Sequence, residues 1–250
     1  MDRSILSRPG PEPDQTLGYG DGPDHAVDAW LPGLPATADR PLVIVIHGGF
    51  WRAEYDRTHT RVMCAALRDV GWPVAAIEYR RVSGHPDAAV DDIREALAHV
   101  PGQLPGTGLI VLGHSAGGHL ALWLASTCPP ADLVGTLALA PLADLAAAHS
   151  AGLSNDAVAE FLGGPPGGRP DLDPKLLGRP AGAVTLIHGT DDTTVPPEIS
   201  RSYMDAHPNA RLVELPATGH YELIDPASHA WLTVQAELER LSSAPRRFVA

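Results

Sequence analysis

Short apolar runs alternate with segments of helical spacing along most of this chain. The clearest case is 109–125, where an aliphatic run leads into a Gly-rich turn, followed by Leu120, Trp123 and Leu124 at helical spacing. A short, fully apolar run of this kind is typical of a strand buried on both faces of a parallel sheet. The pattern therefore predicts a strand, a sharp turn and a helix, with Ser115 in the turn.

The same two patterns recur on both sides of this stretch. Apolar or alternating runs predict further strands at 25–31, 41–46, 73–79, 133–139, 183–187 and 211–215. Apolar residues at helical spacing predict helices at 57–70, 87–100, 198–205 and 226–241. Strands that alternate with helices indicate an α/β fold: a mostly parallel, twisted sheet with helices on both faces. The alternating segment at 25–31 is expected at one edge of this sheet.

The length of 250 residues favours one α/β domain, which we place at 25–242. A Pro-, Gly- and Asp-rich segment at 1–24 is expected to form a loose arm, and 243–250 a frayed tail. Between 151 and 182 the pattern supports only one short helix, at about 156–162. A long connection with little regular structure usually covers a functional site, so we expect 146–182 to form a short cap.

Composition narrows the classes of partner. The net charge is −12, with 18 basic and 30 acidic residues and no cluster of Lys or Arg, so neither nucleic acid nor an anionic membrane is expected as a partner. The two cysteines, Cys64 and Cys128, provide no disulfide framework. The chain shows no signal-peptide pattern and no apolar run of membrane-spanning length, which makes the cytoplasm the expected location. The oligomeric state stays open, a homodimer included.

Polar residues and glycines follow several predicted strands at their carboxyl ends. Because the carboxyl ends of parallel strands meet at one edge of the sheet, where ligands bind, these residues are expected to gather there. They are Gly48–Gly49, Ser115, Asp144, Asp191–Asp192 and Gly219–His220.

The turn at Ser115 is a Gly-x-Ser-x-Gly motif between a strand and a helix, the context in which a serine serves as a nucleophile. The glycines at 113 and 117 suit a turn so sharp that a Cβ would collide with its neighbours. A serine hydroxyl needs a base, and the base needs a group that fixes its tautomer. An aspartate at 191 or 192, followed by His220, provides both in the chain order Ser–Asp–His. The alternative is a Gly-rich turn with a serine that has no catalytic role.

Four segments of the chain resemble α/β-hydrolases of the esterase, lipase and arylformamidase (kynurenine formamidase-like) group. They are His-Gly-Gly-Phe-Trp at 47–51, Gly-His-Ser-Ala-Gly-Gly at 113–118, His-Gly-Thr-Asp-Asp-Thr-Thr-Val-Pro at 188–196, and Gly-His at 219–220. The resemblance implies an α/β-hydrolase fold with Ser115 as nucleophile, Asp192 as the acid and His220 as the base. It also implies an oxyanion hole formed by the backbone N–H groups of Gly49, Phe50 and Ala116, although many lipase-like relatives have a third glycine at the position of Phe50.

Other residues compete for some of these roles. Asp191, and less strongly Asp144, are rivals for the acid. Phe50 and Trp51 are candidates for substrate binding, with structural packing as the alternative for both.

Four further histidines are expected to have structural roles. His47 and His188 open Gly-containing turns and are expected to bond backbone groups, His119 is expected to pack, and His229 lies too far along the last helix to be the base. The twelve histidines include no cluster at metal-ligand spacing, so neither a metal nor another cofactor is expected.

The sequence therefore favours a metal-independent serine hydrolase with a small-molecule substrate. By resemblance, this substrate is a small carboxylic ester or an aryl formamide such as N-formylkynurenine. Two other functions stay open: a peptidase similar to prolyl oligopeptidase, and a non-catalytic binding protein with the hydrolase fold.

Overall fold

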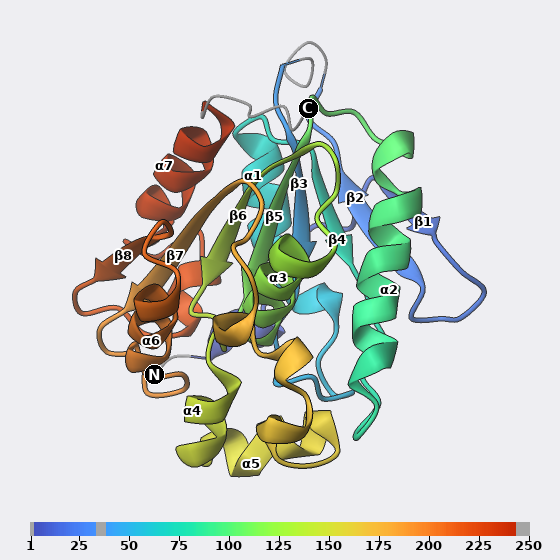
Figure 1. Ribbon diagram of the computed structural model, residues 1–250. Helices are drawn as coiled ribbons and strands as arrows, with labels where there is room; N and C mark the ends of the chain where they lie inside the picture. Colours follow the sequence, from blue (N-terminus) through green and yellow to red (C-terminus); the bar gives the residue numbers. More distant parts are fainter. Residues whose placement is uncertain (1–2, 34–38, 244–250) are drawn as a thin grey trace.

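One eight-stranded sheet forms the centre of the molecule (Figure 1). The computed structural model describes residues 3–33 and 39–243. The strand order is β1-β2-β4-β3-β5-β6-β7-β8; β2 runs antiparallel to its two neighbours, and the strands from β4 to β8 pair in parallel. The strands are β1 (Gln15–Gly18), β2 (Ala26–Trp30), β3 (Leu42–Ile46), β4 (Val74–Ile77), β5 (Leu109–His114), β6 (Leu133–Leu139), β7 (Ala183–Gly189) and β8 (Arg211–Leu215).

Helices cover both faces of the sheet. The α-helices are α1 (Arg61–Asp69), α2 (Pro86–His99), α3 (Ala116–Thr127), α4 (Leu145–Ser150), α5 (Leu153–Leu162), α6 (Glu198–Ala206) and α7 (Trp231–Ser242). Short 3-10 helices lie at η1 (Ser4–Ser7), η2 (Arg57–Thr60), η3 (Pro101–Gln103), η4 (Pro166–Gly168), η5 (Pro170–Leu172), η6 (Pro174–Leu176) and η7 (Tyr221–Ile224). Figure 1 shows α2 and α3 in front of the sheet and α1 behind it.

The central strands are apolar on both faces because each face has its own core. In β3, Ile44 and Ile46 pack with α2 and α3, whereas Val43 and Val45 pack with α1 and α7. All five residues of β3 are buried, which explains its unbroken apolar run. A strand with one solvent-exposed face would alternate apolar and polar residues. The central strands and the turns that follow them are thus fixed by packing from two sides.

The helices α4 and α5 lie beyond the carboxyl ends of the central strands, and the end of the segment 146–182 returns along the sheet to the start of β7 (Figure 1). Residues 151–182 contain α5 and three 3-10 helices where the sequence predicts a single short helix, and most of α4 precedes them in the same segment. Arg52 holds the start of α5: its guanidinium donates to Ser154 Oγ (3.0 Å) and Ser154 O (2.7 Å) and to Glu160 Oε2 (3.0 Å). The segment that we expected to form a cap is therefore attached directly to the loop after β3.

The N-terminal segment differs from the loose arm expected over 1–24. Residues 15–18 form the edge strand β1, so β2, which we expected at the edge, lies inside the sheet. Ile5 of η1 is buried in the core that contains the apolar residues of α1 and α7. The predicted tail is described only at Ser243, since 244–250 lie outside the described residues. Within 3–33 and 39–243, no helix has the length and apolarity to cross a membrane.

Candidate active site

Ser115 occupies a strained turn between β5 and α3. Its backbone has φ 56° and ψ −118°, which only tight constraints impose on a residue with a side chain. A Cβ at Gly113 would lie 2.1 Å from the carbonyl oxygen of Gly117, and one at Gly117 would lie 2.0 Å from that of Ile46. The glycines of the motif are therefore required by space, and the turn presents Ser115 at the N-terminus of α3.

Asp192 and His220 form a buried pair. Asp192 follows β7 and His220 follows β8, and Asp192 Oδ2 lies 2.6 Å from His220 Nδ1. The two residues are only 4% and 1% exposed. Because a carboxylate only accepts, Nδ1 of His220 carries the proton of this bond, and in the neutral ring Nε2 is then the basic nitrogen.

Further hydrogen bonds stabilise Asp192 as an anion. Its Oδ1 accepts from the backbone N–H of Thr194 (2.8 Å) and of Val195 (2.9 Å). Burial alone would raise the pKa of Asp192, but hydrogen bonds from His188 and His220 outweigh it and hold the pKa well below its usual range. The pair therefore contains a carboxylate at neutral pH.

His188 also lies beside the carboxylate of Asp192. Its Nε2 donates to Val195 O (2.8 Å) and lies 3.4 Å from Asp192 Oδ2, while its Nδ1 pairs with Ser200 Oγ (2.7 Å). The expected bond from His188 to backbone is thus present, with an additional contact to the carboxylate.

The loop after β3 turns sharply beside Ser115. Gly49, Phe50 and Trp51 have positive φ angles of 113°, 51° and 55°. A Cβ at Gly49 would lie 2.3 Å from Tyr55 Cβ, so only glycine fits there. The N–H of Ala116 belongs to the first residue of α3, where the helix itself provides no acceptor.

The two aromatic side chains of this loop lie in different surroundings. Phe50 lines the cavity at Ser115, whereas Trp51 is buried in the core. The Trp51 ring stacks on Phe161 of α5 at 4.3 Å and meets His119 edge-on at 5.1 Å. Trp51 is not among the described residues that line the cavity, and its contacts are those of a packing residue; its expected role in substrate binding stays a prediction.

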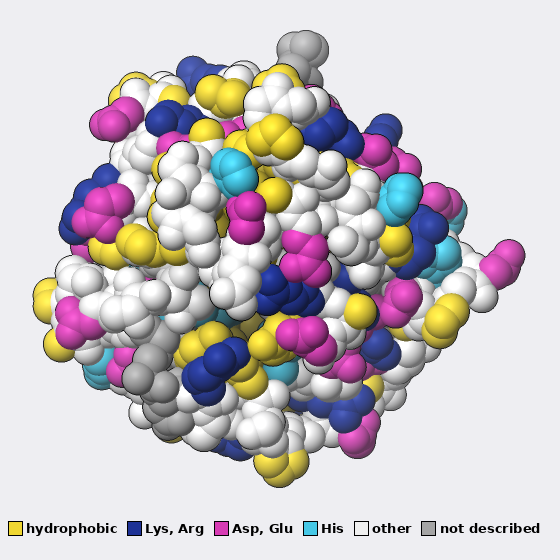
Figure 2. Space-filling model, turned by 90° about the horizontal axis from the view of Figure 1, so that it is seen from below, with side chains coloured by type: hydrophobic (Ala, Val, Ile, Leu, Met, Phe, Trp, Pro, Cys, Tyr) yellow, Lys and Arg dark blue, Asp and Glu magenta, His cyan; other side chains and the backbone are white. Residues whose placement is uncertain are grey.

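Ser115 and His220 line the same cavity, of about 350 Å³. Its walls come from η1 and the residue before it, the loop after β3, η2, the turn between β5 and α3, the start of the cap, the loop after β7 and the start of η7. They are formed by Arg3, Leu6, Gly49, Phe50, Tyr55, His59, His114, Ser115, Ala151, Gly152, Leu153, Ser154, Thr193, Thr194, His220 and Tyr221. Figure 2 shows this face of the molecule, where hydrophobic side chains surround a hollow with Lys or Arg side chains nearby.

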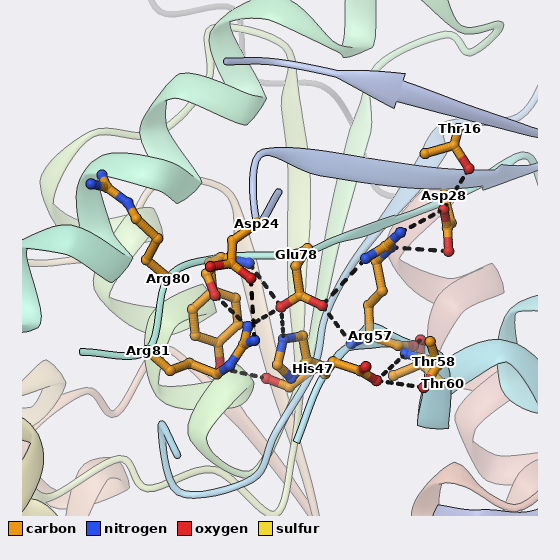
Figure 3. Close-up of polar contacts among 12 residues, drawn as sticks. Thr16, Asp24, Asp28, His47, Arg57, Thr58, Thr60, Glu78, Arg80 and Arg81 are labelled. Carbon is orange, nitrogen blue, oxygen red and sulfur yellow. Dashed lines mark hydrogen bonds and ion pairs between the residues drawn. The ribbon is translucent and has the colours of Figure 1, made fainter. Parts of the chain in front are cut away.

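A second buried imidazole–carboxylate pair lies behind the loop after β3 (Figure 3). His47 Nε2 lies 2.9 Å from Glu78 Oε1, and His47 Nδ1 lies 2.8 Å from Gly48 O. Glu78 also accepts from the backbone N–H of Arg57 (3.0 Å) and from the Arg81 guanidinium. Burial raises the pKa of Glu78, but the bonds to His47, Arg57 and Arg81 prevail and lower it to about 2.

The other aspartates and histidines that the sequence raised for these roles have other partners. Asp191 is exposed and bonds Thr190 Oγ1, whereas Asp144 caps α4 and pairs with Lys175 Nζ at 2.9 Å. His119 is buried, as expected, and pairs with Leu172 O. His229 Nε2 bonds Thr218 Oγ1. Of the two adjacent aspartates, the structure brings only Asp192 to His220.

Several lining residues were not foreseen from the sequence. They are Arg3, Tyr55, His59, His114 and Tyr221. His114 occupies the variable position of the Gly-x-Ser-x-Gly motif, and its Nε2 lies 3.1 Å from His220 O. Only this adjacency to Ser115 gave a signal in the sequence. Within the described residues, no group of three or more His, Cys, Asp or Glu side chains is arranged to hold a metal ion.

A comparison with known protein families shows to which family the chain belongs. Residues 27–163 match the BD-FAE family, and they make up more than half of the chain. The chain belongs to the BD-FAE family. The matched part of this BD-FAE chain includes Gly49 and Ser115 and ends before Asp192 and His220.

Curated relatives of this BD-FAE chain include formamidases and esterases. Kynurenine formamidase from Salmo salar is 34% identical over 111 residues, which cover 44% of this chain and 37% of that protein. Esterase LipC from Mycobacterium tuberculosis is 25% identical over 259 residues, which cover 85% of this chain and 62% of that protein. The chain thus spans less than two thirds of the length of either relative.

Solved structures show the same fold as this BD-FAE chain. Esterase B from Lactobacillus rhamnosis, inhibited by a tributyrin phosphonate, superimposes with a TM-score of 0.78 at 20% identity and covers 96% of this chain and 90% of that one. A truncated form of a carbohydrate esterase from gut microbiota gives a TM-score of 0.74 at 18% identity, and the match covers 94% of this chain and 100% of that truncated chain. The predicted α/β-hydrolase fold and the resemblance to esterases and kynurenine formamidases are confirmed: the chain is an esterase-like α/β-hydrolase.

Proposed function

We propose that the protein hydrolyses small carboxylic esters or aryl formamides through an acyl-enzyme on Ser115. The observation that carries this proposal is the Asp192–His220 pair, whose imidazole lines the same cavity as Ser115. His220 takes the proton of the Ser115 hydroxyl as the oxygen attacks the substrate carbonyl, and then gives it to the leaving group. A water molecule, activated by the same imidazole, releases the acid and restores Ser115.

Asp192 has a positioning and electrostatic role in this proposal. The bonds to Thr194, Val195 and His188 fix its carboxylate, which in turn holds Nδ1 of His220 protonated and Nε2 basic. When the imidazole becomes positively charged, the buried anion beside it stabilises that charge.

The oxyanion of the tetrahedral intermediate is assigned to the backbone N–H groups of Gly49, Phe50 and Ala116. Support comes from the tight left-handed loop at Gly49 and Phe50 and from the position of Ala116 at the first turn of α3, where backbone donors favour negative charge. Loss of one such donor typically costs about 3–4 kcal/mol of transition-state stabilisation.

Two observations favour small substrates. The cavity of about 350 Å³ is near the lower end of the range of roughly 300–1,000 Å³ that small-molecule sites occupy. Similarity to kynurenine formamidase and to LipC supports an aryl formamide or a short ester as the scissile group.

A substrate panel tests the proposal. We would compare kcat/KM for p-nitrophenyl acetate, butyrate and octanoate, a feruloyl ester and N-formylkynurenine, with Ser115→Ala as the matched control. We expect turnover of at least one short ester or the formamide by the wild type and its loss in Ser115→Ala. Equal turnover by a folded Ser115→Ala protein, or none by the wild type, would contradict the proposal.

A further inference from the structure

Among the described residues that line the cavity, the only permanent charge comes from the start of the chain. Arg3 lines the cavity, whereas no Asp, Glu or Lys does so among them. His59 and His114 also line it, but burial and neighbouring histidines lower the pKa of both, that of His59 to about 3. Both rings are therefore neutral at pH 7, while a guanidinium stays protonated.

Two tyrosines of the cavity wall hold the Arg3 guanidinium in place. Its Nη2 donates to Tyr55 Oη at 3.2 Å, and its Cζ lies 5.4 Å from the centre of the Tyr221 ring. Tyr55 belongs to the segment after the loop at Gly49, and Tyr221 follows His220 directly. Arg3 thus contacts two residues that line the same cavity as Ser115.

Packing of η1 fixes the backbone next to Arg3. Ile5 is 3% exposed and packs in the core shared with α1 and α7, and Leu6 lines the cavity. At the end of η1, the Arg8 guanidinium forms two parallel hydrogen bonds with Asp225, at 2.7 and 2.9 Å. These contacts make Arg3 part of the cavity wall, although it precedes the sheet in the sequence.

We propose that Arg3 makes this cavity selective for substrates that carry a carboxylate, in either the acyl or the alcohol part. The inference rests on the proposed function and adds the class of substrate to it. A guanidinium offers five N–H donors in a planar fork, which binds a carboxylate through two parallel hydrogen bonds. The nearby anion Asp192 is not among the lining residues, and its charge is directed to His220 and to backbone N–H groups.

The chain as a whole would otherwise disfavour such a substrate. Its net charge of −12 repels an anionic substrate at distances short enough to escape screening by salt, whereas the positive charge of Arg3 at the cavity attracts it. The preference should therefore weaken as the ionic strength rises.

The test uses matched neutral and anionic esters on the full chain. One pair places the charge in the acyl part, p-nitrophenyl butyrate against mono-p-nitrophenyl glutarate. The other pair places it in the alcohol part, phenyl butyrate against 3-carboxyphenyl butyrate. For at least one pair, we expect Arg3→Gln to lower the anionic-to-neutral ratio of kcat/KM about fivefold to tenfold, Arg3→Glu to lower it further, and Arg3→Lys to retain part of it.

Arg94→Gln is the matched control, because Arg94 is exposed on α2, pairs with Asp91 and does not line the cavity. Its ratios should equal those of the wild type. Ratios unchanged by Arg3→Gln for both pairs would overturn the assignment, and if Ser115→Ala still abolishes hydrolysis of the neutral esters, the proposed function survives that result. A wild-type protein that hydrolyses none of the four esters would overturn the assignment of Arg3, and it would overturn the proposed function too if N-formylkynurenine is not hydrolysed.

Discussion

Two buried imidazole–carboxylate pairs lie at the same edge of this sheet, and of their two imidazoles only that of His220 is among the described residues that line the cavity at Ser115. His220 pairs with Asp192 at 2.6 Å, and His47 pairs with Glu78 at 2.9 Å. All four side chains are nearly inaccessible. Judged by pairing alone, either pair suits a general base.

The surroundings of the pairs differ. The ring of His47 uses Nδ1 toward Gly48 O and Nε2 toward Glu78, and it stacks on Tyr79 at 4.4 Å. His220 uses Nδ1 toward Asp192 and lines the cavity together with Ser115. A buried imidazole–carboxylate pair is therefore no evidence of catalysis without access. Under the proposed function, the pair at His220 positions a base, whereas the pair at His47 is expected to stabilise a turn.

Among the substitutions that distinguish the two pairs, one at His220 is expected to have the largest effect on activity. His220→Ala should lower kcat about 10⁴-fold or more, because Ser115 then has no base, and the double variant with Ser115→Ala should be little worse. The measurement is kcat for a short p-nitrophenyl ester. Residual activity above a tenth of the wild-type value would place the base elsewhere.

The next effect concerns the carboxylate of the same pair. Asp192→Asn should lower kcat about 10³- to 10⁴-fold, because the amide no longer enforces the Nδ1-protonated ring. Asp191→Asn is the matched control and should stay close to wild type, since Asp191 is exposed and bonds Thr190. The reverse result in the same kinetic assay would exchange the two roles.

Glu78 should matter for stability more than for chemistry. Glu78→Gln removes the charge that His47, Arg57 and Arg81 share, and breaking a buried pair typically costs about 3–5 kcal/mol. Urea unfolding measures this loss. The control is Glu214→Gln, which breaks an exposed pair with Arg201 and should change stability little. A variant as stable as the wild type would show that the network does not hold the turn.

The smallest effect is the pH dependence of that stability. The folded-state pKa of Glu78, about 2, lies below its ordinary value of 4.5. A carboxyl group whose pKa is lower in the folded than in the unfolded state stabilises the fold fully above pH 4.5. This contribution is lost as the pH falls toward 2. The free energy of unfolding of the wild type should therefore fall more steeply over this range than that of Glu78→Gln. Parallel curves would contradict the assigned cause.

The sequence predicted the elements of the parallel sheet well, because its strands are buried on both faces. The run predicted at 133–139 has the observed bounds of β6, and that at 41–46 differs from β3 by one residue. β1 escaped prediction because only four residues, half of them exposed, pair at the edge. A short strand with one exposed face has too few residues for an alternating apolar pattern to stand out.

Within the candidate site, residues fixed by local geometry were predictable and those fixed by long-range packing were not. The strained turn at Ser115 follows from its own glycines, and similarity to known acid segments favoured Asp192 over Asp191. The separation of Phe50 from Trp51 depends on three consecutive positive φ angles, which no periodicity encodes. Arg3 reaches the cavity only because η1 packs against distant elements.

The most direct test of the account is covalent labelling with a fluorophosphonate probe, followed by peptide mapping of the modified residue. The account predicts that the wild type is labelled at Ser115 alone. It also predicts that folded Glu78→Gln is still labelled there, and that folded His220→Ala loses the label. Modification of another residue, or equal labelling of Ser115 in His220→Ala, would contradict the claim that the cavity-facing pair activates this serine.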